Sequence, residues 1–440
     1  MNNKNVDRRV FLGTVGTVGI SASLANINNA FGAGQPQTTG TETNKPADPN
    51  DVKTQQEQAA LLVPKRELGK TGVKVSTLGL GMMYNVVDNQ IILRSALRYG
   101  VTFWDTASSY GGGNSELGIG NFFQANPEER KNVFLASKAS GANSVARIDE
   151  RLKQSFERLK TNYIDLYEYP HGLSNPSQLS DDVKKWAENA KKNNQIKYFG
   201  FSAHSNQAAL LEAAAKLGWI DVIMFSYNYR LAQDSALQKA IDAAYKAKIG
   251  LVAMKAAGSA SSAREGGRGW RGGREQPAAA ESTESQKLNE QLLARGFTQI
   301  QAAIKLVMDD QRISCVNVGM DNVPILTANV AASLDKNKLT AEEQQAFRQY
   351  ALATCSGYCA GCSQICDSAL QQKSYVSDIM RSLMYYNSYG REDMAREVFA
   401  QIPSDVRSNL LRIDYSTAEA RCPQQIPIRN YIAEAFEKLA

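Results

Sequence analysis

The feature that most constrains the fold is an alternation of two kinds of segment between residues 64 and 335. Short apolar runs rich in β-branched and aromatic residues alternate there with amphipathic stretches of helical period, which is typical of β/α units. Eight runs are expected to be strands: Val75–Leu80, Thr102–Asp105, Val133–Ser137, Ile164–Tyr169, Tyr198–Ser202, Val222–Phe225, Leu251–Met254 and Cys315–Val318. Helices are expected at Asn89–Tyr99, Ser144–Lys160, Ser180–Asn193, Asn206–Leu217, Ser235–Lys248 and Thr298–Met308.

This pattern predicts an α/β fold in which eight parallel strands close into a (β/α)8 TIM barrel. The alternative is an open doubly wound sheet, but no Gly-x-Gly-x-x-Gly follows the first strand. A short hairpin, formed by Lys65–Leu68 and Gly72–Val75, is expected to close the bottom of the barrel.

The chain outside the barrel divides into three further segments. Residues 1–33 are expected to be a targeting segment, and residues 34–63, rich in polar residues, a flexible linker. The barrel takes residues 64–335, and residues 336–440 are expected to form a helical, cysteine-rich extension. The net charge of +6 is not gathered into one run, so we expect no nucleic-acid partner.

The targeting segment contains the paired arginines Arg8 and Arg9, then Val10-Phe11-Leu12 and a weakly apolar run. This order resembles a twin-arginine (Tat) export signal. The resemblance implies that the Tat machinery exports the chain, which would be periplasmic or anchored to the outer face of the membrane. The alanines near residue 30 complete no Ala-x-Ala pattern, so cleavage is left open. The alternative is a basic N-terminus without regular structure.

Three chemically active residues come at or just after the ends of consecutive strands: Asp105, Lys138 and His171. The carboxyl ends of barrel strands meet at one face, where active sites of this fold lie. Any one of these residues could simply solvate a loop. Because three of them follow consecutive strands, we expect them to converge on one site.

The local sequence around these residues resembles that of a known enzyme family. The segment Phe103–Gly111, continued by Asn114–Gly118, resembles the signature of the aldo-keto reductases, and Leu135–Lys138 does so as well. The opening of the barrel region, Arg66–Gly72 and Leu78–Gly81, is also similar. The resemblance implies a nicotinamide-dependent oxidoreductase that interconverts a carbonyl and an alcohol on a small-molecule carbonyl substrate.

Reduction of a carbonyl needs a hydride at carbon and a proton at oxygen. The resemblance implies Tyr110 as the acid, Lys138 as the cation that lowers its pKa, and Asp105 as the carboxylate that holds Lys138. A histidine completes the family's set, and His171 is the candidate here. It stands one residue later than expected, with Pro170 in the usual place. His171 can reach the site only if Pro170 bends the strand or a bulge forms.

The resemblance also implies NAD(P)H as the cofactor. The residues matched to cofactor contacts are Ser202, Met224, Met254, Lys255, Gly258, Gly319 and Asn329. The segment after the last strand lacks the Lys and Arg that would bind a 2′-phosphate, so NADP is not favoured over NAD. The segment Ala263–Gly273 is rich in glycine and arginine and could cover a pyrophosphate, or could be an insertion without regular structure.

The extension holds Cys355, Cys359, Cys362, Cys366 and Cys422. Ferredoxin-like clusters use close cysteine spacings and often a Cys-Pro, and some aldo-keto reductases resemble this chain in carrying such a tail. The spacing of the middle three is not that of the standard bacterial run. We therefore expect Cys359, Cys362, Cys366 and Cys422 to bind a [4Fe-4S] cluster that is structural or passes electrons to a redox partner. Disulfides and zinc are the alternatives, and Cys355 leaves the ligand set open.

Two functions remain at this stage. The first is the oxidoreductase described above. The second is a barrel that binds a cofactor or partner, or transfers electrons, without carbonyl turnover. The displaced His171, and Met224 where the family usually has Gln, keep the second open.

Overall fold

The computed structural model describes residues 62–258 and 297–440, together with residues 290, 292 and 294. The twin-arginine motif and the segment 263–273 lie outside these residues. Across the part of the chain that is described, no helix has the length and apolar character needed to span a bilayer.

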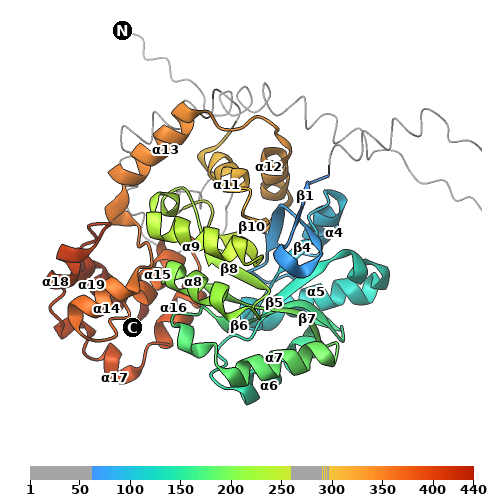
Figure 1. The fold of residues 1–440 in the computed structure, drawn as a ribbon, viewed down its shortest axis with the longest axis horizontal. Coiled ribbons are helices and arrows are strands. Elements are labelled where there is room, and N and C mark those ends of the chain that lie inside the picture. Colours follow the sequence, from blue (N-terminus) through green and yellow to red (C-terminus); the bar gives the residue numbers. More distant parts are fainter. Residues whose placement is uncertain (1–61, 259–289, 291, 293, 295–296) are drawn as a thin grey trace, which may run out of the picture.

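Eight parallel strands close into a barrel in the order β10-β3-β4-β5-β6-β7-β8-β9, which confirms the predicted fold (Figure 1). The strands are β3 (Leu78–Gly81), β4 (Phe103–Asp105), β5 (Phe134–Lys138), β6 (Ile164–His171), β7 (Ile196–Ala203), β8 (Val222–Ser226), β9 (Gly250–Met254) and β10 (Cys315–Gly319). The helices that follow them along the chain are α4 (Ile91–Arg98), α5 (Asn114–Ala125), α6 (Val145–Leu159), α7 (Asp181–Lys192), α8 (Gln207–Leu217), α9 (Ser235–Lys246), α11 (Gln299–Asp309) and α12 (Val323–Leu334).

The predicted hairpin is present as the antiparallel pair β1 (Lys65–Glu67) and β2 (Lys74–Ser76). Its turn lies against the start of β9, since Lys70 N donates to Lys248 O over 2.7 Å. Gly69 has φ +55°, and a Cβ there would lie 2.3 Å from Gly250 N. The turn therefore needs glycine both for its backbone angle and for this close approach. The hairpin plugs the end of the barrel at which the strands begin.

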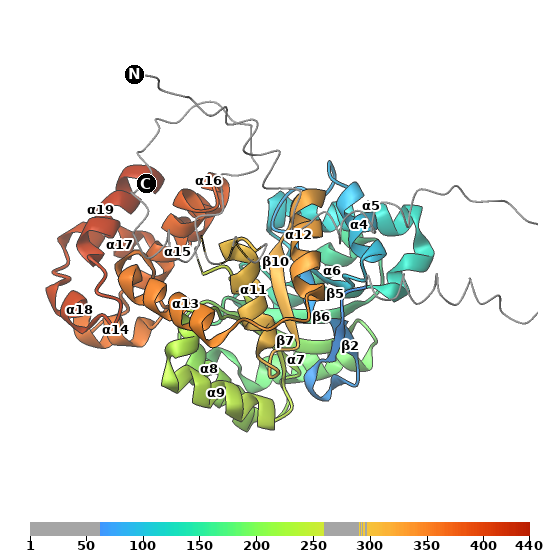
Figure 2. The ribbon, with the colours of Figure 1, turned by 90° about the horizontal axis from the view of Figure 1, so that it is seen from above.

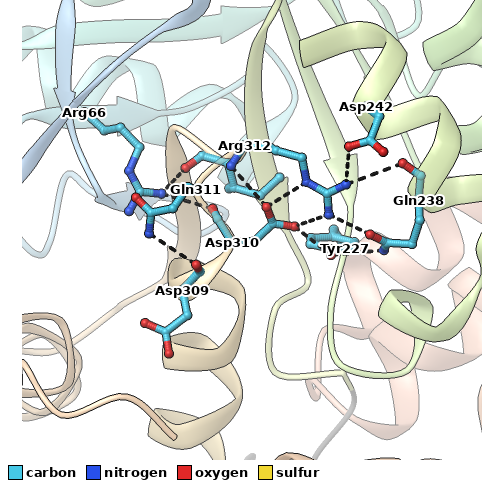
Figure 3. Close-up of polar contacts among 9 residues, drawn as sticks. Arg66, Tyr227, Gln238, Asp242, Asp309, Asp310, Gln311 and Arg312 are labelled. Atoms are coloured by element: carbon cyan, nitrogen blue, oxygen red, sulfur yellow. Dashed lines mark hydrogen bonds and ion pairs between the residues drawn. The ribbon is translucent and has the colours of Figure 1, made fainter. Parts of the chain in front are cut away.

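Figure 3 shows a polar network that joins the hairpin to the connection between α11 and β10. Arg66 donates to the backbone carbonyls of Met308 over 3.1 Å and Asp310 over 3.2 Å. Arg312 donates to Asp310 Oδ1 over 2.9 Å and to Asp242 Oδ1 over 2.7 Å, and Asp242 lies on α9. These charge-assisted hydrogen bonds tie the plug and the outer helices to one another.

The extension is helical, as predicted, and forms a lobe against the barrel (Figure 2). Its helices are α13 (Ala341–Ala353), α14 (Ser363–Leu370), α15 (Val376–Asn387), α16 (Glu392–Ala400), α17 (Ser404–Arg407), α18 (Ser416–Arg421) and α19 (Ile428–Leu439). Ala107 and Tyr110 of the barrel belong to the same buried cluster as the apolar faces of α15, α16 and α19. The extension thus packs directly on the end of the barrel at which the strands finish.

Candidate active site

A buried ion pair lies at the carboxyl ends of β4 and β5. Lys138 is 1% exposed, and its ammonium contacts Asp105 and donates to Thr106 O over 2.8 Å. Asn317 Nδ2 of β10 donates to the second oxygen of Asp105 over 2.9 Å. A buried ammonium and carboxylate are stable when each has the other and further hydrogen bonds. The structure therefore brings the predicted pair together.

Glu168 is a second carboxyl group beside Lys138, and sequence reasoning missed it. Its Oε2 lies 3.9 Å from Lys138 Nζ, and among the described residues neither oxygen has a hydrogen-bond partner. Burial raises the pKa of Glu168 above its ordinary value. Glu168 is two residues beyond Leu166, which faces the barrel interior. The alternation of side chains along a strand would have placed Glu168 inside as well.

Tyr110 opens a single 3₁₀ turn, Tyr110–Gly113, directly after the β4 end. Gly111 has φ +59°, and a Cβ there would lie 3.0 Å from Tyr84 O, so the turn needs glycine. The turn brings the Tyr110 ring to 5.0 Å from Lys138 Nζ, measured to the ring centroid. Tyr110 is 9% exposed, so its phenol is held in a largely dry site.

The pKa of Tyr110 differs from the expectation that Lys138 lowers it. Burial, followed by the charge of Asp105, raises the pKa of Tyr110 well above its ordinary value. The carboxylate that balances the Lys138 ammonium also acts on the phenol, so the ion pair brings Tyr110 no net fall in pKa. The cation that does lower the pKa of Tyr110 is Arg381 of α15, a residue that sequence reasoning did not name.

His171 reaches the site through an irregularity in β6. Glu168 pairs with Gly200 and His171 pairs with Ser202, so β6 uses three steps where β7 uses two. This bulge, which contains the cis peptide bond between Tyr169 and Pro170, provides the shift that the sequence required. The His171 ring then lies edge-on to Tyr110 with centroids 5.7 Å apart.

His171 is held by a hydroxyl and kept neutral by its surroundings. Its Nδ1 lies 2.7 Å from Ser140 Oγ, and Ser140 Oγ accepts a hydrogen bond from Ser109 Oγ over 3.0 Å. Burial lowers the pKa of His171 well below its ordinary value, and Lys138 and Arg381 lower it further. A neutral imidazole can donate a hydrogen bond to a substrate oxygen without carrying a charge.

The residues matched to cofactor contacts differ in their position along the strands and in their exposure. Ser202 and Met254 stand at the carboxyl ends of β7 and β9, whereas Met224 lies in the middle of β8, is 1% exposed and packs in the barrel interior. Gly319 ends β10 at the surface, and Lys255 and Gly258 follow β9. Asn329 lies on the buried face of α12 with Leu326 and Val330.

Two side chains of α15 complete the mouth of the barrel. Lys255 Nζ donates to Tyr385 Oη over 3.5 Å and lies 4.5 Å from the centroid of that ring. It also lies 4.7 Å from the ring of Tyr389. Arg381 Nη1 approaches Gly172, the residue after His171, to within 3.3 Å of where a Cβ would stand. The role of Arg381 and Tyr385 depends on how the extension docks on the barrel, which no local sequence pattern predicts.

All six cysteines are free thiols, and four of them gather in the extension. Burial raises the pKa of Cys359 to about 12, and the thiols that raise it further are those of Cys362, Cys366 and Cys422. Cys355 is not among them. In the described segments no set of three or more Cys, His, Asp or Glu side chains is arranged to hold a metal ion. The predicted ligands are therefore neighbours, but they are not gathered as closely as a metal site requires.

Comparisons with known proteins agree with this geometry. The model of the aldo/keto reductase family matches residues 77–351. The uncharacterized oxidoreductase YqkF of Bacillus subtilis is 32% identical over 153 residues, which are 32% of this chain and 48% of that protein. L-galactose dehydrogenase of Arabidopsis thaliana is 25% identical over 297 residues, which are 63% of this chain and 91% of that protein. The chain thus matches about half the length of the first relative and most of the second.

The solved structures show the same barrel. An aldo-keto reductase from Bacillus halodurans, in its holo form, superposes with a TM-score of 0.52 at 24% identity. The match covers 65% of this chain and 96% of that one. The match leaves 35% of this chain uncovered.

Proposed function

The chain belongs to the aldo/keto reductase family, and we propose that it interconverts a carbonyl and an alcohol with a nicotinamide cofactor, using Tyr110 as the proton donor. The observation that supports this most directly is the meeting of Tyr110, the Asp105–Lys138 pair and His171 at one end of the barrel. The cofactor, when bound, supplies or accepts the hydride at the substrate carbon.

The residues of the chain would handle the proton and the substrate oxygen. A phenol with a raised pKa keeps its proton at neutral pH, so Tyr110 is in the form that reduction requires. His171, being neutral, would donate to the substrate oxygen and orient it. Lys138, held by Asp105, would attract the negative charge that develops as the proton leaves Tyr110, and the Asp105 carboxylate offsets this attraction.

The cofactor site would be built from the strand ends. Met254 is apolar and 8% exposed, which fits contact with a flat ring. Ser202 Oγ accepts from Gly172 N over 3.0 Å, which leaves its own O–H to donate to a carboxamide. These residues fit the nicotinamide end of the cofactor.

A turnover assay tests the proposal. The purified full-length chain, mixed with NADH or NADPH and a panel of aromatic and aliphatic aldehydes, should oxidise the dinucleotide and form one alcohol per dinucleotide consumed. Loss of dinucleotide absorbance and chromatography of the alcohol would measure both. If the dinucleotide binds but no carbonyl is reduced, the barrel is a binding protein and the proposal is wrong.

We propose further that Cys359, Cys362, Cys366 and Cys422 bind a [4Fe-4S] cluster. The mutual proximity of these four thiols, apart from Cys355, supports this ligand set. Their present spacing means that the cluster would have to draw the ligands together on binding. Such a cluster would be structural or would pass electrons to a redox partner through the extension.

We propose that the chain is exported by the Tat machinery, on the strength of Arg8 and Arg9. That route carries folded proteins, which would allow a cluster to be inserted before export. Replacing both arginines with Lys should leave the protein in the cytoplasm, because the paired guanidinium groups are the recognised feature. Cell fractionation with an antibody would measure this. Extracytoplasmic protein at the unaltered level would exclude the Tat route.

A further inference from the structure

We propose that Lys255 and Arg381 form an anion-binding site beside the catalytic residues, and that it takes the carboxylate or phosphate group of the substrate. The inference rests on the proposed function for the identity of the substrate, and it specifies that substrate as a carbonyl compound with an acidic group. The site belongs half to the barrel and half to the extension.

The site is a cavity of about 190 Å³ between the two lobes. The barrel contributes His204, Ser226 and Lys255, which follow or end β7, β8 and β9. Helix α15 contributes Arg381 and Met384, and the segment from Ser356 to Gly361 closes another side. Ligand pockets for whole drug-sized molecules are typically ~300–1,000 Å³. This cavity therefore suits a compact group with a few carbon atoms.

Lys255 is a half-buried cation without an acidic partner among the described residues. No carboxylate of the described residues lies within ion-pair distance of its Nζ, whose contacts are the hydroxyl and ring of Tyr385 and the ring of Tyr389. Lys255 is held at φ +60°, where non-glycine residues are uncommon, and its carbonyl accepts from Asn228 Nδ2 over 3.1 Å. The backbone is thus fixed in an unusual conformation that directs this cation toward the extension.

Arg381 is the second cation, and part of its donor capacity is unused. Its Nη2 donates to Asp378 over 3.2 Å, but its Nε is buried and has no hydrogen-bond partner among the described residues. An unsatisfied buried N–H costs free energy, which an added acceptor would recover. Since Gly172 has no Cβ, the guanidinium can approach the backbone that follows His171. An anion held by Arg381 would therefore lie close to the catalytic groups.

The charge balance of the cavity favours an anion. Its lining, as far as the chain is described, includes Lys255 and Arg381 but no Asp or Glu. His204 adds no charge of either sign, because burial and then the two cations lower its pKa and leave it neutral. A planar guanidinium with a free N–H suits a carboxylate or phosphate oxygen. The buried ring of Tyr385 covers one side of Lys255, and a less polar environment strengthens the attraction between opposite charges.

Two aldehydes of matched shape test the site: 4-carboxybenzaldehyde and 4-methylbenzaldehyde. A hydrogen bond to a charged group is worth ~1.5–3 kcal/mol, so its loss corresponds to ~10–100-fold in kcat/KM. We expect Arg381→Gln to lower kcat/KM for the acid by that factor more than for the neutral aldehyde. Arg381→Lys should keep part of the preference. Arg396→Gln, an exposed arginine on α16, is the matched control and should leave the preference as it is.

Binding of benzoate, measured by calorimetry without a cofactor, separates this inference from the proposed function. If the wild-type protein binds benzoate and Arg381→Gln and Lys255→Gln weaken that binding, the anion site stands even when no aldehyde is reduced. Two outcomes would overturn it. One is an unchanged preference together with unchanged benzoate affinity. The other is a loss confined to dinucleotide affinity, which would assign both cations to the cofactor's phosphates.

Discussion

Replacing Tyr110 with Phe should lower kcat for carbonyl reduction by ~10²-fold or more, because the substrate oxygen loses its proton donor. The ring would remain in place, since it packs in the buried cluster that the extension shares and lies edge-on to His171. Dinucleotide affinity should therefore change little. Steady-state kinetics and fluorescence titration of the dinucleotide would measure the two effects separately.

Tyr84→Phe is the matched control for this experiment. Tyr84 adjoins the same glycine turn, but its hydroxyl donates to the backbone oxygen of Met320 over 2.6 Å and faces no catalytic group. Its loss should leave kcat close to that of the wild type. A Tyr110→Phe enzyme with kcat within tenfold of the wild type would remove Tyr110 from the mechanism and leave His171 or a water as the donor.

The direction of the Tyr110 pKa shift also fixes how the two reaction directions respond to pH. Reduction needs the protonated phenol, which a raised pKa preserves throughout the neutral range. Oxidation of the alcohol needs a proton acceptor, so its rate should rise with pH and fall when the phenol is protonated. Arg381 opposes the rise in the pKa of Tyr110. The docked extension therefore takes part in setting this balance.

The sequence was sufficient for the barrel because hydrophobic period and strand-end chemistry are local properties. The alternation placed all eight strands. The predicted bounds of the first strand were wrong, because Val75–Leu80 is divided between β2 and β3. The division falls at Thr77, whose backbone N–H donates to Pro64 O. The need for a bulge before His171 followed from the two-residue repeat of a strand, and the register shift in β6 satisfies it.

What the sequence could not provide was the contribution of segments that are distant along the chain. Arg381 and Tyr385 lie on a helix whose amphipathic pattern predicts only that one face is buried. Which part of the barrel that face covers depends on tertiary docking. The pKa of Tyr110 therefore depends on the barrel and the extension together, and no sequence motif predicts it.

The cysteine cluster gives the second large effect. The full-length protein, purified without oxygen, should be brown and should contain iron and inorganic sulfide, because four thiolates would bind one cluster. Cys422→Ser should lose most of the iron, although Cys422 is remote in sequence, since its thiol lies beside the other three. Elemental analysis, sulfide assay and visible absorbance would measure this.

Cys355→Ser is the control that makes the ligand set falsifiable, because Cys355 lies in the same extension but outside the group of four thiols. It should keep its iron. If Cys355→Ser loses iron while Cys422→Ser retains it, a cluster exists but the ligand assignment is wrong. Colourless protein with thiols that react only after reduction would indicate disulfides, and colourless protein whose thiols a chelator frees would indicate zinc.

Because the four thiols are neighbours without forming a ready metal site, cluster binding should also order the extension. Limited proteolysis should therefore cut the iron-free protein between Cys366 and Cys422 more rapidly than the iron-loaded form, and equal cutting of both forms would show that the extension folds without its cluster.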